Sequence, residues 1–228
     1  MIAEIADSSH GTFGYDIAMA AAFPDSFELA GGSIFLGGSL VARIKGTALV
    51  DTIKALKAIK KRGGQPELER VVGQLGAETR KIFDAPVKSW DWYSIDVFAE
   101  LLEALVRETA NGNPEILTER SEQVVDSQLR GVYRIFIKLG SPGYVIKRIA
   151  AVHETYFDGI QIIPEVDDSR QASIKYVGFK KRHAILQYTI IGFFRKALEL
   201  SGAKQVNVNF KVPMSDDAAY SEVAITWA

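Results

Sequence analysis

The sequence contains no cysteine, which excludes disulfide bonds, thiolate metal ligands and cysteine nucleophiles. This absence is typical of proteins in the reducing cytoplasm, where we expect this chain to work. A charge excess is missing too, because 27 Lys and Arg residues are balanced by 28 Asp and Glu residues. The balance gives no electrostatic reason to expect a nucleic acid or an acidic membrane surface as partner.

Long apolar runs and catalytic signatures are also lacking. No run approaches the ~18 to 20 apolar residues that a membrane-spanning helix requires. The short apolar run near the N-terminus follows acidic residues, where a signal peptide would carry positive charge. The GGS pairs at Gly31 and Gly37 lack the Lys-Ser/Thr of a phosphate loop, and no G-x-S-x-G motif occurs. We therefore expect no membrane span, no export and no enzyme activity.

Apolar periodicity predicts a mixed architecture. Helical spacing occurs in residues 47–62, 66–75, 95–110, 114–139, 142–157 and 183–201. Strand character follows in residues 160–163 and 172–177, with the acidic stretch "EVDDSRQ" predicted as the turn between them. Apolar and polar residues alternate strictly in residues 204–212 and less regularly in residues 220–228, which predicts a terminal β-hairpin. The prediction is an α+β fold with a helical layer packed on a C-terminal antiparallel sheet, formed by residues 47–228, and an N-terminal arm with short strands, residues 1–46.

Four segments, taken in order, resemble a known superfamily. They are "IKGTALVDTIKAL", "WDWYSIDVFAELLEAL", "FIKLGSPGYVIKRIA" and the tail "LELSGAKQVNVNF…YSEVAITWA". From about Thr47 onward the chain resembles an uncharacterised paralogous family of myxobacteria. Through that family it is similar to the haem nitric-oxide/oxygen-binding (H-NOX), 4-vinyl-reductase and TRAPP-like domains. The resemblance implies an internal pocket in a ligand-binding or sensory domain, or a dimeric adaptor of the TRAPP kind.

His153 is the central candidate residue. It shares a helix face with Ile149 and Phe157, so its imidazole is predicted to point inward. Both ring nitrogens then need partners, and three alternatives remain: a core histidine bonded to a carbonyl or hydroxyl, a haem iron ligand, or a contact for another pocket ligand. On the residues alone the first alternative leads, and the resemblance adds weight to the second, because His153 matches the proximal haem ligand of H-NOX domains.

The H-NOX resemblance also implies a Tyr-x-Ser-x-Arg segment that contacts the haem propionates. Here the matching stretch is "YVGFK": Tyr176 is retained, Gly178 replaces the hydroxyl, and Lys180 replaces the guanidinium. A lysine neutralises a carboxylate but lacks the bidentate fork of arginine. We therefore expect no haem, and no other cofactor or metal, and predict a small hydrophobic or amphipathic ligand contacted by His153, Tyr176, Lys180, Ile149 and Phe157.

Two further clusters leave alternatives open. The basic run "KKRH", residues 180–183, is predicted as a solvated turn, with an anion clamp as the alternative. The aromatic run "WDWY" is predicted to cover the core, with Trp90, Trp92 and Tyr93 as an interaction surface in the alternative. Together with the apolar arm residues 17–23, that surface is the basis of a second hypothesis, a homodimeric adaptor.

Overall fold

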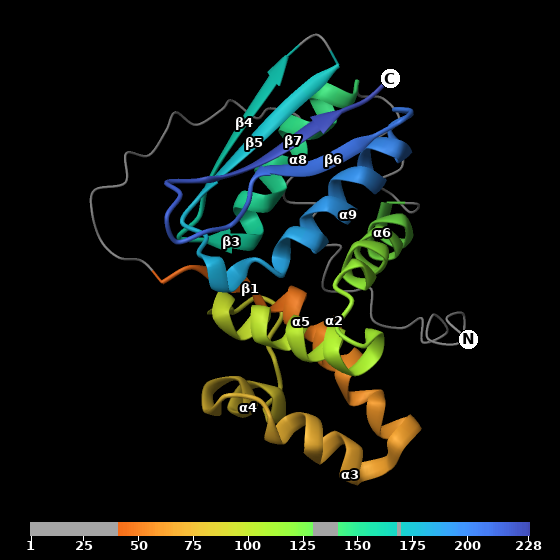
Figure 1. Cartoon of the computed structure of the whole chain (residues 1–228), viewed down its shortest axis with the longest axis vertical. Helices are drawn as coiled ribbons and strands as arrows, with labels where there is room; N and C mark the ends of the chain where they lie inside the picture. Colours follow the sequence, from red (N-terminus) through yellow and green to blue (C-terminus); the bar gives the residue numbers. More distant parts are fainter. Residues whose placement is uncertain (1–40, 130–140, 168–169) are drawn as a thin grey trace. The chain divides into compact units, whose positions relative to one another are not determined.

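A four-stranded antiparallel sheet forms one side of the protein. The computed structural model describes residues 41–129, 141–167 and 170–228 (Figure 1). The strands lie in the order β4 (Gln161–Asp167), β5 (Gln171–Val177), β7 (Ser221–Thr226) and β6 (Asn207–Val212). The predicted strands and terminal hairpin are confirmed. The predicted acidic turn is shorter than expected, because Glu165 lies within β4 and its carboxylate pairs with Lys175 of β5 at 2.7 Å.

Two helices cover one face of this sheet. Figure 1 shows α8 (Pro142–Tyr156) and α9 (Leu186–Leu200) running along it, and α6 (Glu115–Leu129) packs on α9. Alternate residues of each strand point toward these helices, as the pleat requires. The buried layer between sheet and helices includes Ile162, Ile174, Tyr176, Val208, Val223, Ile225, Ile146, Ile149, Ile190, Phe194 and Leu198. This layer is the predicted core between helices and C-terminal sheet.

A smaller sheet joins α8 to the N-terminal helices. Strand β1 (Arg43–Lys45) lies between β2 (Trp92–Ser94) and β3 (Phe157–Asp158), and all pairs are antiparallel. Strand β3 follows α8 directly, so its pairing with β1 holds the end of α8 in place. Helices α2 (Gly46–Lys57) and α5 (Ile95–Ala110) leave the same sheet and pack on each other. As predicted, Ser94 caps α5 by accepting a hydrogen bond from the Asp96 N–H at 3.2 Å.

The helices after α2 differ in part from the prediction. Helix α3 (Ile59–Gly73) is two helical segments joined at Gly64, whose φ of +77° only glycine adopts readily. The predicted break at this glycine is therefore a kink. Helix α4 (Ala77–Asp84) was not predicted, because eight residues give too few apolar repeats to reveal a period.

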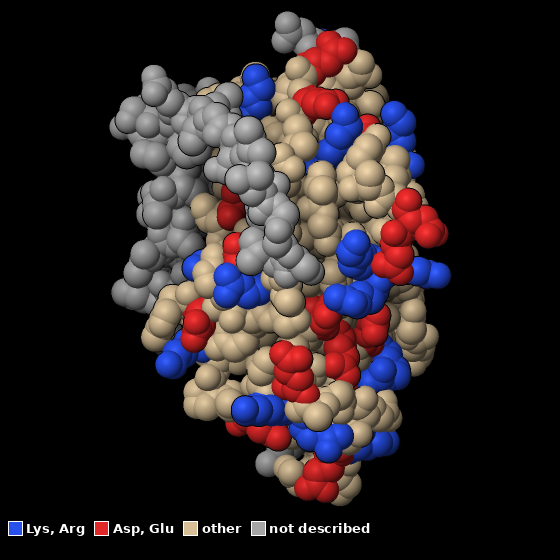
Figure 2. All heavy atoms as spheres, turned by 90° about the vertical axis from the view of Figure 1, so that its left-hand side faces the viewer, with Lys and Arg blue, Asp and Glu red and all other residues tan. Residues whose placement is uncertain are grey.

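Residues 41–228 form one compact unit, and the arm predicted for residues 1–46 lies outside the described residues except at its end, where β1 forms. Residues 130–139 of the helix predicted for residues 114–139 also lie outside the described residues. Among the described residues, no helix is both long and apolar enough to cross a lipid bilayer. Figure 2 shows basic and acidic side chains intermixed over the described part of one face, in line with the balanced charge.

Candidate functional site

His153 lies in the core, surrounded by aromatic rings. Its exposed fraction is 6%. The ring centroids of Phe157, Tyr176, Phe193 and Phe194 lie 5.1 to 6.0 Å from the imidazole centroid. These side chains come from β3, β5 and α9, so the site is assembled where the sheet meets its two covering helices. Of the predicted site residues, the structure brings His153, Tyr176 and Phe157 together, and the buried Ile149 lies one turn earlier on α8.

The imidazole of His153 forms one hydrogen bond to a side chain. Its Nδ1 lies 2.8 Å from the hydroxyl oxygen of Tyr176. No described residue forms a hydrogen bond with the other ring nitrogen, Nε2. Burial lowers the pKa of His153 from 6.5 to about 4, because the apolar surroundings disfavour the charged imidazolium. The ring is therefore neutral at pH 7, and Nε2 is the atom that a further ligand would meet.

Tyr176 is even more deeply buried than His153. Its exposed fraction is 0%, and burial raises the pKa of its hydroxyl well above the usual value. The hydroxyl is a neutral partner for His153 at every pH at which the protein works. Since it faces the core, it is not placed to contact a charged carboxylate at the surface.

The rest of the stretch "YVGFK" does not fit the propionate clamp that the H-NOX resemblance implies. Gly178 has a φ of +113°, and a Cβ there would lie 2.8 Å from the backbone oxygen of Gly159, so a serine is excluded without backbone movement. Lys180 is exposed and does not join the aromatic cluster. The described residues around His153 thus offer an imidazole but no clamp for the carboxylates of a haem.

The basic run after β5 is exposed at Lys180, Lys181 and Arg182, in line with the predicted solvated turn, but its last residue, His183, is buried. His183 is 1% exposed, and its Nδ1 accepts a hydrogen bond from the Lys180 N–H at 3.0 Å. The proton therefore sits on Nε2, which donates to the Asp96 carboxylate at 2.6 Å. Arg182 donates to the same carboxylate. The run ties the short 3₁₀ turn η2 (Lys181–His183) to the first turn of α5 through His183 and Arg182.

Burial and hydrogen bonding have opposite effects on the pKa values of Asp96 and His183. Burial alone would raise the pKa of Asp96, but the hydrogen bonds from His183 and Arg182 outweigh it and hold the pKa below its usual value. For His183, burial lowers the pKa and outweighs the attraction of Asp96. The pair is therefore a neutral imidazole bonded to a carboxylate at pH 7.

Trp90 does not cover the core, contrary to the prediction. Its exposed fraction is 73%, whereas Trp92 and Tyr93 are half-buried. Lys45 lies over the Trp92 ring at 4.0 Å, and its ammonium donates to the backbone oxygen of Trp90 at 3.3 Å. Only Trp90 of the three is thus free to contact a partner.

Comparison with solved structures identifies the fold. An unliganded Fe(II) H-NOX protein mutant from K. algicida superposes with a TM-score of 0.55 at 15% identity, over 81% of this chain and 97% of that chain. An S. oneidensis H-NOX protein in the Fe(II)NO ligation state superposes with a TM-score of 0.56 at 11% identity, over 81% of this chain and 99% of that chain. An oxygen-binding H-NOX domain related to soluble guanylate cyclases superposes with a TM-score of 0.50 at 15% identity, over 81% of this chain and 95% of that chain.

These likenesses show that the chain has an H-NOX-like fold, as its sequence predicted. No family model matches the chain, and no curated protein matches it.

Sequence reasoning missed part of the site. The run "GFFRKA" contains Phe193 and Phe194, which contact His153 from α9, and Asp96 binds the basic run from α5. Nothing in the sequence indicated that α9 packs beside α8. Asp96 had only the weak signal of an acidic residue in the first turn of a helix.

Proposed function

We propose that the chain is a non-catalytic, haem-free domain that binds a small hydrophobic or amphipathic molecule beside His153, in a cytoplasmic sensory or regulatory role. One observation carries this proposal: a neutral, buried imidazole has a ring nitrogen with no hydrogen-bond partner among the described residues, inside a shell of aromatic side chains. His153 is 6% exposed, and its Nε2 is not among the fully buried unpaired atoms of the described residues, so a ligand there would take the place of water at this nitrogen.

The ligand would lie among apolar and aromatic surfaces. His153 and Tyr176 supply the polar contacts, and Ile149 and Phe157 supply the apolar ones, while the exposed Lys180 would serve a charged end at the surface. A ligand that approaches Nε2 would meet the aromatic rings beside the imidazole. Phe193 is the half-buried ring of the four and is the side chain best placed to move aside.

The absence of haem is part of the proposal. The H-NOX proteins of similar fold are described in Fe(II), NO-bound and oxygen-binding forms. In this chain, the buried Tyr176 hydroxyl bonds to His153, Gly178 has no side chain, and Lys180 points to solvent. These three features favour a ligand other than haem. The sequence resemblance to 4-vinyl-reductase domains and to myxobacterial paralogues, which the structural comparisons do not test, also motivates a ligand-binding role.

The first prediction concerns haem. Purified protein incubated with haem is expected to give only the absorption spectrum of free haem, because the described residues lack a propionate clamp. Absorbance spectroscopy across the Soret region checks this, with His153→Gln as the matched control, which should give the same spectrum. A shifted Soret band that His153→Gln abolishes would contradict the haem-free proposal and assign His153 as the iron ligand.

The second prediction concerns a bound molecule. Native mass spectrometry of the full chain is expected to show a monomer with an added small mass that disappears on denaturation. His153→Gln should reduce the fraction carrying this mass, since it alters the polar contact. A monomer with no added mass, at the concentration used and after gentle purification, would contradict the proposal.

A dimeric adaptor of the TRAPP-like kind is the second candidate, favoured by the exposed indole of Trp90. Exposed tryptophans are frequent hot spots of protein interfaces. The same native mass spectrum separates the two candidates, because a dimer without added mass supports the adaptor. Trp90→Ala should then convert that dimer to a monomer.

A further inference from the structure

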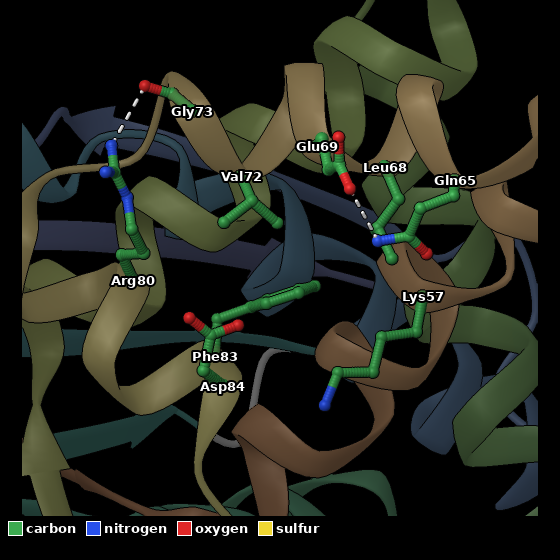
Figure 3. Close-up of a pocket in the computed structure, with 9 residues that line it drawn as sticks. All are labelled: Lys57, Gln65, Leu68, Glu69, Val72, Gly73, Arg80, Phe83 and Asp84. Carbon is green, nitrogen blue, oxygen red and sulfur yellow. Dashed lines mark hydrogen bonds between the residues drawn. The ribbon is translucent and has the colours of Figure 1, made fainter.

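Helices α2, α3 and α4 surround a hollow that is separate from the His153 site. Its volume is about 580 Å³, within the roughly 300 to 1,000 Å³ typical of small-molecule sites. Figure 3 shows the side chains that line it. None of the aromatic residues around His153 is among them.

The base of the hollow is apolar. Phe83 of α4 is 1% exposed, and Leu68 and Val72 of α3 are half-buried beside it. A ligand that covers Leu68 and Val72 would remove apolar surface from water, which stabilises the complex. The base therefore favours a ligand with an aliphatic or aromatic body.

None of the four charged side chains of the rim forms an ion pair within the described residues, and two of them, Lys57 and Asp84, form no hydrogen bond there either. The ammonium of Lys57 lies 5.0 Å from the centroid of the Phe83 ring, and no described acidic side chain pairs with it. Asp84 likewise forms no ion pair or hydrogen bond within the described part of the chain. In the view of Figure 3, Lys57 lies to the right of the Phe83 ring and Asp84 to its left.

The other two charges of the rim are already engaged. Arg80 donates to the backbone oxygens of Gly73 and Leu75 at 3.0 and 3.1 Å. Glu69 accepts a hydrogen bond from the Gln65 side chain at 2.9 Å. Lys57 and Asp84 are thus the cation and the anion of the rim that have no hydrogen-bond partner among the described residues. A ligand with a single charge would be attracted by one of them and repelled by the other.

We propose that this hollow binds a zwitterion with an apolar side chain, that is, a free aliphatic or aromatic amino acid. Its carboxylate pairs with Lys57, its ammonium pairs with Asp84, and its side chain packs on Leu68, Val72 and Phe83. This ligand matches both free charges and the apolar base at once. The inference does not depend on the proposed function, because it concerns a different part of the fold.

Isothermal titration calorimetry of the full chain tests the ligand class. L-leucine and L-phenylalanine, at up to millimolar concentration, are expected to give saturable binding. N-acetyl-L-leucine loses the positive charge and L-leucinamide loses the negative one, so each should bind about fivefold more weakly or worse. The proposal is overturned if neither free amino acid saturates, or if the blocked forms bind as well as L-leucine.

Paired variants test the site. Lys57→Met keeps an apolar stem over Phe83 and Asp84→Asn keeps the side-chain shape, and each should weaken L-leucine binding about fivefold or more. The controls Lys54→Met, on the same helix as Lys57, and Glu78→Gln, on the same helix as Asp84, lie outside the lining and should leave it unchanged. Equal effects in test and control variants would also overturn the proposal. Circular dichroism confirms that each variant is folded.

Discussion

Acidification from pH 6.5 to pH 4 is expected to lower the free energy of unfolding by about 3 kcal/mol through His153 alone. In the folded protein, burial lowers the pKa of His153 to about 4, whereas the unfolded chain has a pKa near 6.5. Between these values the unfolded chain binds a proton that the folded protein does not. The stabilisation is complete above pH 6.5 and is lost as the pH falls toward 4. Since domains are stable by only about 5 to 15 kcal/mol, the loss is large.

Urea unfolding at a series of pH values measures this effect, and His153→Gln is the matched variant. Glutamine keeps a polar group for the Tyr176 hydroxyl but does not titrate in this range. The carboxylate of Asp96 and the imidazole of His183 titrate in both the wild type and the variant. The difference between the two pH profiles of the unfolding free energy therefore isolates His153. Parallel profiles for wild type and His153→Gln would contradict a buried neutral imidazole at position 153.

The order of elements was largely predictable from the sequence, because it depends on local patterns. The inward stripe of Leu49, Ile53, Leu56 and Ile59 is buried, and the Ser94 cap and the terminal hairpin are where the periodicity indicated. Short elements were not predictable, since α4 spans about two turns and its only fully buried apolar residue is Phe83. In the helix predicted for residues 114–139, Val125 is buried on α6, whereas its apolar neighbour Val124 is 38% exposed.

For the site around His153, the sequence could predict the face of the helix on which a residue lies, but not the contacts between different elements. The helix period placed His153 on the inner face with Ile149, and both are buried; Tyr176 was named only through the H-NOX resemblance. Their hydrogen bond joins residues 23 positions apart and depends on the packing of α8 against the sheet. The contacts of Phe193 and Phe194 depend on how α8 and α9 lie side by side, which no local pattern encodes. For the same reason, the hollow between α2, α3 and α4 could not be read from spacing.

Replacing Gly192 with alanine is expected to destabilise the fold by about 2 to 3 kcal/mol. Helices α6 and α9 approach each other closely at this glycine, where a Cβ would overlap the backbone oxygen of Thr118 and lie 2.9 Å from the Cβ of Ser121. The hydroxyls of Thr118 and Ser121 donate to the Tyr188 and Thr189 carbonyls at 3.1 and 2.7 Å. A methyl group would force the helices apart and break these bonds.

Gly73→Ala is the matched control for chemical denaturation. Gly73 ends α3, and a Cβ there meets nothing within 4 Å, so alanine should leave stability unchanged or raise it by about 0.5 to 1 kcal/mol. Equal changes in both variants would contradict the close approach of α6 and α9.

Because Phe193 and Phe194 directly follow Gly192, the Gly192→Ala substitution should also loosen the aromatic shell around His153. The pKa of His153, measured by NMR titration of the folded variant, should then rise from about 4 toward 6.5 as water reaches the imidazole.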